Sequence, residues 1–83
     1  ALAVTFNVAS IAAGSCVDSS VTVTGAATGD FVHVNADFAL PANVQIGNAR
    51  VTAANTVELK LCNNDLLLPR DPASGPYNFV LER

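Results

Sequence analysis

Few residues in this chain have side chains and spacings that could do chemistry. The sole histidine, His33, shares one face of a predicted strand with Asn35 and Asp37. A metal site needs several strong ligands at defined geometry, and a general base needs a positioned partner. A single histidine without a second strong ligand is more typical of an exposed strand residue. We therefore expect no catalytic, metal or cofactor site at His33.

Three aspartates in predicted loops, Asp30, Asp65 and Asp71, could in principle bind Ca²⁺. The spaced Asp-x-Asn-x-Asp-Gly pattern of a calcium loop is absent, so each carboxylate is expected to accept hydrogen bonds from backbone amides of its own turn. The sequence also lacks a phosphate-binding glycine loop, a nucleophile elbow and a sheltered carboxylate pair. It therefore predicts a protein that is not an enzyme and has no cofactor.

The two cysteines, Cys16 and Cys62, leave two alternatives open. One bridge between them would staple the second strand region to the fifth. The first 17 residues have no cationic leader, so we expect synthesis in a cytoplasm, where disulfides are rare. A free cysteine also behaves as a small buried hydrophobe. On these grounds we expect two reduced, buried thiols.

Alternation of apolar and polar residues predicts short strands along nearly the whole chain. The clearest is 56–62, where Val57, Leu59 and Leu61 face inward between Glu58 and Lys60. The other predicted strand regions are 1–8, 16–24, 31–38, 44–53 with a bulge or turn at Gly47-Asn48, and 77–81, after a loop over 70–76. The expected core comprises Val23, Val32, Val34, Phe38, Val51, Val57, Leu59, Leu61 and Phe79.

The turn spacing predicts an all-β fold in a single domain over residues 1–83. It is typical of a compact antiparallel β-sandwich, jelly-roll-like or Ig-like, with about six to eight short strands. No stretch is apolar enough for a membrane span. The net charge of −3 and a pI near 4.6 argue against a nucleic-acid partner.

Only 13% of the residues are charged, about half the usual share. A small β domain with so few charges has little protection against association through its edges and faces. We therefore expect an oligomer or a bound subunit, most simply a homotrimer. The predicted contact residues lie first in two loops with rigid apolar projections, and second in the N-terminal strand: Leu40, Pro41, Leu66, Leu67, Leu68 and Pro69, then Val4 and Phe6.

Several segments, in order along the chain, resemble small β domains of tailed-bacteriophage structural proteins. They are Ile11-Ala12-Ala13-Gly14-Ser15, Val21-Thr22-Val23-Thr24-Gly25-Ala26, Gly29-Asp30-Phe31-Val32, Ala39-Leu40-Pro41, Arg50-Val51-Thr52-Ala53-Ala54-Asn55-Thr56-Val57 and Asp71-Pro72-Ala73-Ser74-Gly75. Such domains serve as head-decoration (cement) proteins or as head- and tail-fibre modules. The two cysteines and the Asn63-Asn64-Asp65 turn depart from that pattern.

The resemblance implies a virion protein without catalytic residues. A decoration protein is the favoured form: it would bind the major capsid protein on the outer head surface, as a trimer, and stabilise the capsid lattice. Two other functions are compared with it. A fibre or host-attachment module that binds glycans would need exposed aromatics or a polar groove. A small secreted β domain would need an oxidised Cys16–Cys62 pair.

Overall fold

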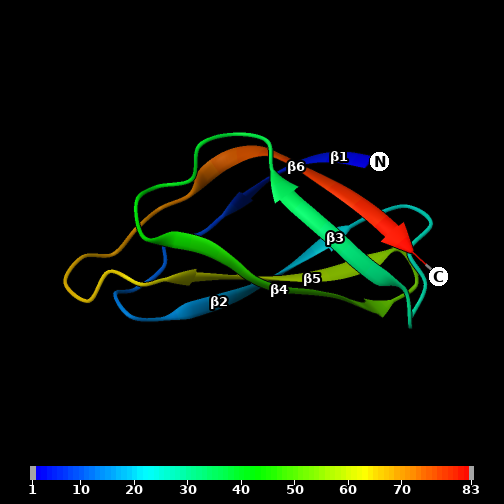
Figure 1. Cartoon of the computed structure of the whole chain (residues 1–83), viewed down its shortest axis with the longest axis horizontal. Coiled ribbons are helices and arrows are strands. Elements are labelled where there is room, and N and C mark those ends of the chain that lie inside the picture. Colours follow the sequence, from blue (N-terminus) through cyan, green and yellow to red (C-terminus); the bar gives the residue numbers. More distant parts are fainter. Residues whose placement is uncertain (1, 83) are drawn as a thin grey trace.

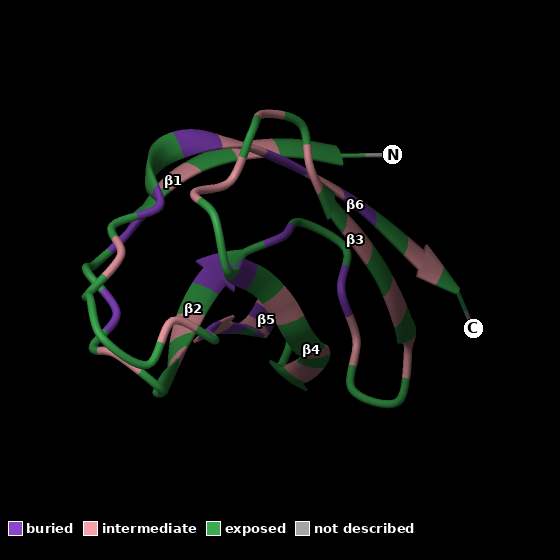
Figure 2. Ribbon diagram, turned by 60° about the vertical axis from the view of Figure 1, so that its left-hand side comes forward, coloured by how far each residue is buried: buried purple, intermediate pink, exposed green. Residues whose placement is uncertain are grey.

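The structure is a computed structural model that describes residues 2–82 of the chain. The strands are β1 (Leu2–Val8), β2 (Cys16–Thr22), β3 (Phe31–Ala36), β4 (Val44–Ala53), β5 (Thr56–Asn63) and β6 (Ala73–Glu82). They form two antiparallel sheets, in the orders β1-β6-β3 and β2-β5-β4, which face one another (Figures 1 and 2). The predicted all-β sandwich is confirmed. No helix within residues 2–82 is long and apolar enough to cross a membrane.

The core lies between the sheets and is filled by alternate residues of each strand. In β5, Val57, Leu59 and Leu61 are all fully buried, as their period of two predicts. The remaining expected core residues are either buried or half-buried against the same cluster: Val23 and Phe79 in the first group, and Val32, Val34, Phe38 and Val51 in the second. The predicted bulge in β4 is also present, as a register shift between Ile46 and Asn48.

The last strand begins earlier than the sequence predicts. Residues 73–76 were expected in a loop because prolines and glycine are turn formers, but β6 begins at Ala73 and is the central strand of its sheet. Pro76 is tolerated because β3 ends at Ala36, which pairs with Tyr77. The Pro76 carbonyl accepts a hydrogen bond from the Asp37 amide (2.9 Å), so its missing N–H lies on the side where the β3 ladder has ended.

An aromatic cluster explains the glycine in β6. The ring of Tyr77 stacks on Phe6 (4.4 Å between centroids) and meets the edge of Phe38 (5.3 Å). A Cβ atom on Gly75 would lie 2.5 Å from the Phe38 ring, so only glycine leaves room for this packing. Tyr77 is fully buried, and its burial raises the pKa of the phenol.

Cys16 and Cys62 form a disulfide, so the prediction of two reduced, buried thiols is wrong. The two residues are directly opposite one another in the β2–β5 ladder, with 4.0 Å between their Cα atoms. The bridge lies on the outer face of its sheet, where Cys16 is exposed and Cys62 half-buried. The pairing of β2 with β5 brings together two cysteines that are 46 positions apart, and local sequence patterns do not predict that proximity.

The outer faces of the two sheets differ in charge. On β2-β5-β4, Asp18 lies opposite Lys60, and Arg50 contacts Glu58 (3.5 Å). Among the described residues of β1-β6-β3, only His33 and Glu82 can carry a charge. They pair with each other, with 2.8 Å between His33 Nε2 and Glu82 Oε1. The rest of this face is made of small, amide, hydroxyl and apolar residues.

Candidate functional site

Three of the four most exposed large apolar residues within residues 2–82 lie together at one end of the molecule. Leu66, Leu67 and Leu68 form a loop after β5, here named the leucine tip, with relative exposures of 81%, 87% and 55%. The molecule is elongated, at 39 × 20 × 16 Å, and the tip lies in the yellow-to-orange loop at the far left of Figure 1. Three successive leucines in contact with water forgo the favourable free energy of burying their apolar surface unless another surface covers them.

The tip is held from beneath by a buried asparagine. The side chain of Asn63, 1% exposed, donates from Nδ2 to the carbonyls of Ile11 (3.1 Å) and Leu68 (3.0 Å). Its Oδ1 accepts from the Asp65 amide (2.9 Å). A buried amide must satisfy its donors and acceptor, so these bonds fix both ends of the loop to the core. The sequence analysis predicts only a turn here, although Asn63 continues the inward alternation of Val57, Leu59 and Leu61.

A carboxylate fixes the middle of the same loop. Asp65 Oδ1 accepts from the amides of Leu67 (2.9 Å) and Leu68 (3.2 Å). Its Oδ2 accepts from Arg70 Nη2 (2.6 Å) and Nε (3.2 Å). The Leu67 amide and then the Arg70 side chain hold the pKa of Asp65 below its ordinary value. The expectation that loop aspartates accept backbone amides is confirmed, because Asp30 and Asp71 bond the amides of Ala27 and Ala73.

The loop before β2, residues 9–15, buttresses the tip from the side. Ile11 and Arg70 exchange two backbone hydrogen bonds (2.7 and 3.0 Å). Gly14 donates its amide to the Asp65 carbonyl (2.8 Å), and its φ of +67° is one that glycine adopts without strain. A Cβ at this glycine would lie 3.6 Å from Leu66 Cδ2, so the loop closely underlies the tip.

The other predicted contact residues are less available. Val4 and Phe6 are half-buried and pack against the core, as does Leu40. Pro41 is half-buried, and Pro69 is exposed next to the tip. The structure therefore brings Leu66, Leu67, Leu68 and Pro69 together as one exposed surface, and it places the other four elsewhere.

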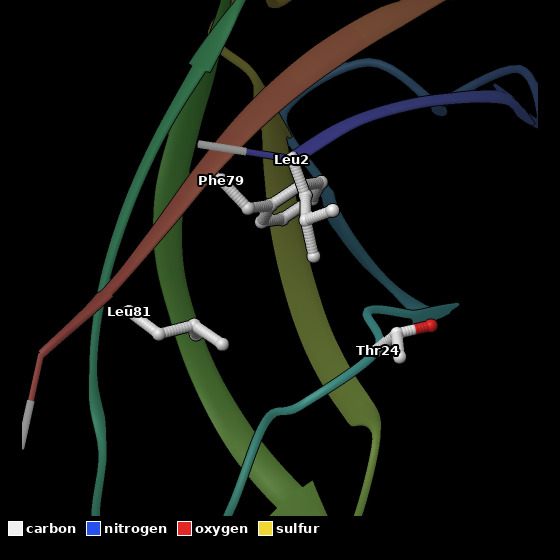
Figure 3. Close-up of a pocket in the computed structure, with 4 residues that line it drawn as sticks. All are labelled: Leu2, Thr24, Phe79 and Leu81. Atoms are coloured by element: carbon white, nitrogen blue, oxygen red, sulfur yellow. The ribbon is translucent and has the colours of Figure 1, made fainter.

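A second apolar feature lies between the sheets, toward the opposite end of the strands. It is a wide, shallow depression of about 400 Å³ lined by the apolar residues Leu2, Phe79 and Leu81 and by the polar Thr24, here named the apolar hollow. Figure 3 shows Leu2 on β1 and Phe79 and Leu81 on β6, with Thr24 on the segment after β2. Leu2 is 41% exposed, so the hollow opens to solvent. Sequence patterns do not reveal it, because it depends on how the two sheets separate.

The residues considered first for chemistry are not gathered into a site. His33 and its partner Glu82 each have side chains 61% exposed. Within residues 2–82 there is no group of three or more histidine, cysteine or acidic side chains that could hold a metal ion. The features that distinguish this molecule are therefore the leucine tip and the apolar hollow. No protein-family model, curated protein or solved structure matches the chain.

Proposed function

We propose that this protein is a non-catalytic assembly subunit: a decoration (cement) protein that binds the outer head surface of a tailed bacteriophage and stabilises the capsid lattice. The single observation that carries the assembly role is the leucine tip, which is exposed and yet held by Asn63, Asp65 and Arg70. The phage setting rests on the ordered segments that resemble virion β domains. The proposed partners are the major capsid protein and further copies of this chain.

The construction of the tip favours binding over mere surface exposure. Ordering a flexible loop on binding costs free energy, whereas a loop already fixed by hydrogen bonds avoids most of that cost. Burying a leucine side chain contributes about 1.5–3 kcal/mol before the costs of association. One tip therefore gives a modest contact. Many copies on a regular lattice sum such contacts by avidity, which is how a small protein can strengthen a shell.

The surroundings of the chemically capable residues support a role without catalysis. Catalytic groups work in sheltered sites where partners hold them and water is excluded. His33 lies on an open sheet face and pairs with a solvent-exposed carboxylate, that of Glu82. Glycan binding through stacking would need exposed rings, and Phe31 (70% exposed) is the only aromatic residue of residues 2–82 in that state. This favours decoration over host attachment.

The disulfide favours a second candidate function, that of a small domain outside the cytoplasm. Disulfides persist in oxidising surroundings and are rare where thiol reductants act. The Cys16–Cys62 bridge lies on an outer face, where solutes can reach it. It is compatible with a virion after release from the cell, and equally with a secreted β domain. The deletion experiment described next therefore tests both the proposed function and the proposed location on the capsid surface.

The deciding experiment uses virions from which the gene for this protein has been deleted. Heads without the protein should assemble but withstand heat and low salt less well, and adding purified protein should restore resistance in proportion to occupancy. Leu67→Ser should restore it poorly. Phe31→Ser, which removes another highly exposed apolar side chain (70% against 87% for Leu67) away from the tip, is the matched control and should restore it fully.

Two results would overturn the proposal. Heads of normal heat resistance that fail to adsorb to cells would assign the protein to host attachment. Normal heads together with normal adsorption, and the protein found only outside the particles, would assign it to the secreted class.

A further inference from the structure

We infer that two copies of this chain associate by pairing their β1 strands antiparallel, so that their β1-β6-β3 sheets join into one continuous sheet. The inference rests on the proposed function in that further copies of this chain are among its partners, and it identifies where they meet. The sheet order places β6 on one side of β1 and no described strand on the other. The free side of such an edge strand presents unpaired backbone N–H and C=O groups that another strand can bond.

Among the edges of the described sheets, β1 alone has no protective device. Proteins protect edge strands with charges, prolines, bulges or a covering segment. The edge strand β2 carries Asp18, and β4 carries Arg50 and a bulge after Ile46. The edge strand β3 carries His33 and packs beside β4. β1 is a continuous run of uncharged residues without proline, glycine or a register shift. We therefore expect a strand to cover this edge in the assembly.

Pro76 shows which backbone groups of β1 face the free edge. Its carbonyl accepts from the Asp37 amide (2.9 Å), on the β3 side of β6. In an antiparallel ladder the N–H and C=O of one residue point to the same neighbour, and successive residues alternate. Thr5 lies opposite Pro76, so the backbone groups of Thr5 point away from β6. By alternation those of Ala3 and Asn7 do so too, and no loop within residues 2–82 bonds any of the three.

A second copy of β1 fits these groups in one register. Hydrogen-bonded pairs must join edge-facing residues of both copies, which are Ala3, Thr5 and Asn7. A twofold axis at Thr5 uses all of them, because Thr5 then pairs with Thr5 of the second copy, and Ala3 pairs with Asn7 in both directions. These pairs exchange about six hydrogen bonds. The register also keeps the inward faces of both sheets on the same side, since it joins odd-numbered residues to odd-numbered ones.

The side chains that this register brings together are compatible. On the outer face, threonine lies beside threonine and Ala3 beside Asn7. On the inner face, the half-buried Val4 and Phe6 lie beside each other across the two copies. Threonine pairs and pairs of an aromatic with a β-branched residue are favourable neighbours in antiparallel sheets, whereas like charges directly opposite repel. A residue on the twofold axis meets its own copy, so the absence of charge from β1 suits a partner identical to itself.

The geometry predicts a weak dimer with two outward tips. The paired segment is shorter than a standard interface requires, so its dissociation constant should be roughly 10–500 µM. A contact between identical surfaces closes at two copies, which differs from the homotrimer expected from the sequence. β1 runs toward the leucine tip, because the loop that follows it bonds Asp65 and Arg70 at the base of the tip. Antiparallel strands therefore place one free tip at each end of the dimer, so a single dimer can bridge two capsid sites.

The first test measures association of the unaltered protein. Sedimentation equilibrium over about 0.01–1 mM spans the expected dissociation constant and should show a monomer–dimer equilibrium. Amide exchange with solvent, measured by NMR over the same range, should slow at least about twofold at Thr5 and Asn7 at the upper concentration. The amides of Val4 and Phe6 face β6 and should be protected throughout. A protein that stays monomeric, or a dimer in which the Thr5 amide is not protected, overturns the inference.

The second test places charges on the twofold axis. Thr5 is exposed, and unchanged thermal unfolding confirms that Thr5→Lys and Thr5→Glu fold. Alone, each variant should raise the dissociation constant at least about tenfold, because like charges then lie opposite one another. An equal mixture should recover dimers, each with one lysine and one glutamate at the axis. Thr52→Lys, at an exposed threonine of the edge strand β4, is the matched control and should dimerise as the original protein does.

The outcomes separate this inference from the proposed function. A protein that strengthens deleted heads but stays monomeric retains the function and overturns the inference. A protein that dimerises through β1 but leaves deleted heads unchanged retains the inference and overturns the function. Dimers that persist in both Thr5→Lys and Thr5→Glu, or variants that fail to recover dimers when mixed, overturn the twofold pairing at Thr5.

Discussion

The two ends of β5 are each fixed by an asparagine, but in different ways. At one end, Asn55 adopts a left-handed backbone (φ 60°) in the β4–β5 turn and accepts a hydrogen bond from the Gly25 amide on its exposed side chain (2.8 Å). Its backbone also exchanges bonds with Val23 and Ala26. At the other end, Asn63 is buried, and its side chain bonds two segments: the loop before β2 at Ile11, and the tip loop at Asp65 and Leu68.

The difference shows how one small sandwich makes two kinds of surface. At the Asn55 end, backbone bonds keep neighbouring loops close to the strands, and the open space between the sheets remains as the apolar hollow. At the Asn63 end, a buried amide supports a longer loop from below, so apolar residues can project without collapsing onto the core. The projecting leucine tip therefore depends on the buried side chain of Asn63 for its support. The apolar hollow needs no such support, because it forms where side chains leave the space between the sheets unfilled.

The largest expected effect comes from removing the covalent bond at the Asn63 end. The Cys16–Cys62 bridge spans 46 positions and joins the two strand ends from which the tip and its buttress begin. By the chain-entropy model, the double variant Cys16→Ser with Cys62→Ser should lose about 4 kcal/mol of unfolding free energy. Urea titration of the variant beside the oxidised protein measures the loss.

Reduction with a phosphine should reproduce that loss without mutation, which controls for the serine substitutions. The variant itself should not respond to the reductant. Thiol titration of the untreated native protein should find no free thiol, before or after unfolding under non-reducing conditions. Two free thiols in that sample would refute the bridge and restore the original expectation of reduced cysteines.

The second effect compares the two asparagines directly. Asn63→Ala removes a buried side chain, its bond to the Leu68 carbonyl and the acceptor of the Asp65 amide, while the Ile11 carbonyl keeps only the Arg70 amide as donor, so it should cost about 3 kcal/mol. Asn55→Gly is the matched change at the other end. Glycine accepts the left-handed backbone, and the lost bond is exposed, so the cost should be about 1 kcal/mol or less.

Urea unfolding of both variants gives the two free energies, and hydrogen exchange of the Leu67 and Leu68 amides reports on the tip itself. Those amides should exchange faster in Asn63→Ala and unchanged in Asn55→Gly. Equal losses of stability, or a tip that keeps its protection without Asn63, would show that the loop does not depend on the buried amide.

The sequence predicts the strands well where the signal is local. Val57, Leu59 and Leu61 alternate with Glu58 and Lys60, and one buried face is enough to fix such a strand. The exposure of Leu66–Leu68 was also predictable, because a short apolar run beside Pro69 cannot continue a ladder. Both inferences depend only on neighbours within a few positions.

The remaining features depend on contacts between distant segments. The disulfide follows from the β2–β5 register, and the early start of β6 from where β3 ends beside Pro76. The partners of Asn63 are hidden for the same reason. Its inward position continues the alternation of Val57, Leu59 and Leu61, but Asn-Asn-Asp is a typical turn sequence, and only the approach of Ile11 and of the loop's own end makes this residue a support.

The smallest expected effect is the loss of stability at low pH through the Asp65 carboxylate, which supports the tip. The pKa of Asp65 in the folded protein is below its ordinary value of 3.8, so the folded state binds fewer protons there than the unfolded state. Its contribution to stability is therefore complete above that ordinary value, and it is lost as the pH falls through the folded pKa. Below about pH 4, stability should fall more steeply in the original protein than in Asp65→Asn.

The variant Arg70→Gln tests whether the arginine or the backbone amides bonded to Asp65 cause this dependence of stability on pH. The Leu67 amide is the largest single cause of the lowered pKa and the Leu68 amide adds to it, while Arg70 contributes both a hydrogen bond and its charge, so removing the arginine should leave part of the pH dependence in place. Unfolding by urea at intervals between pH 2 and pH 5 compares the three proteins. If Arg70→Gln is as flat as Asp65→Asn, the ion pair dominates, and the tip is then held by charge and sensitive to salt. If its slope stays close to that of the original protein, backbone amides hold the carboxylate, and the support of the tip is built from hydrogen bonds at both Asn63 and Asp65.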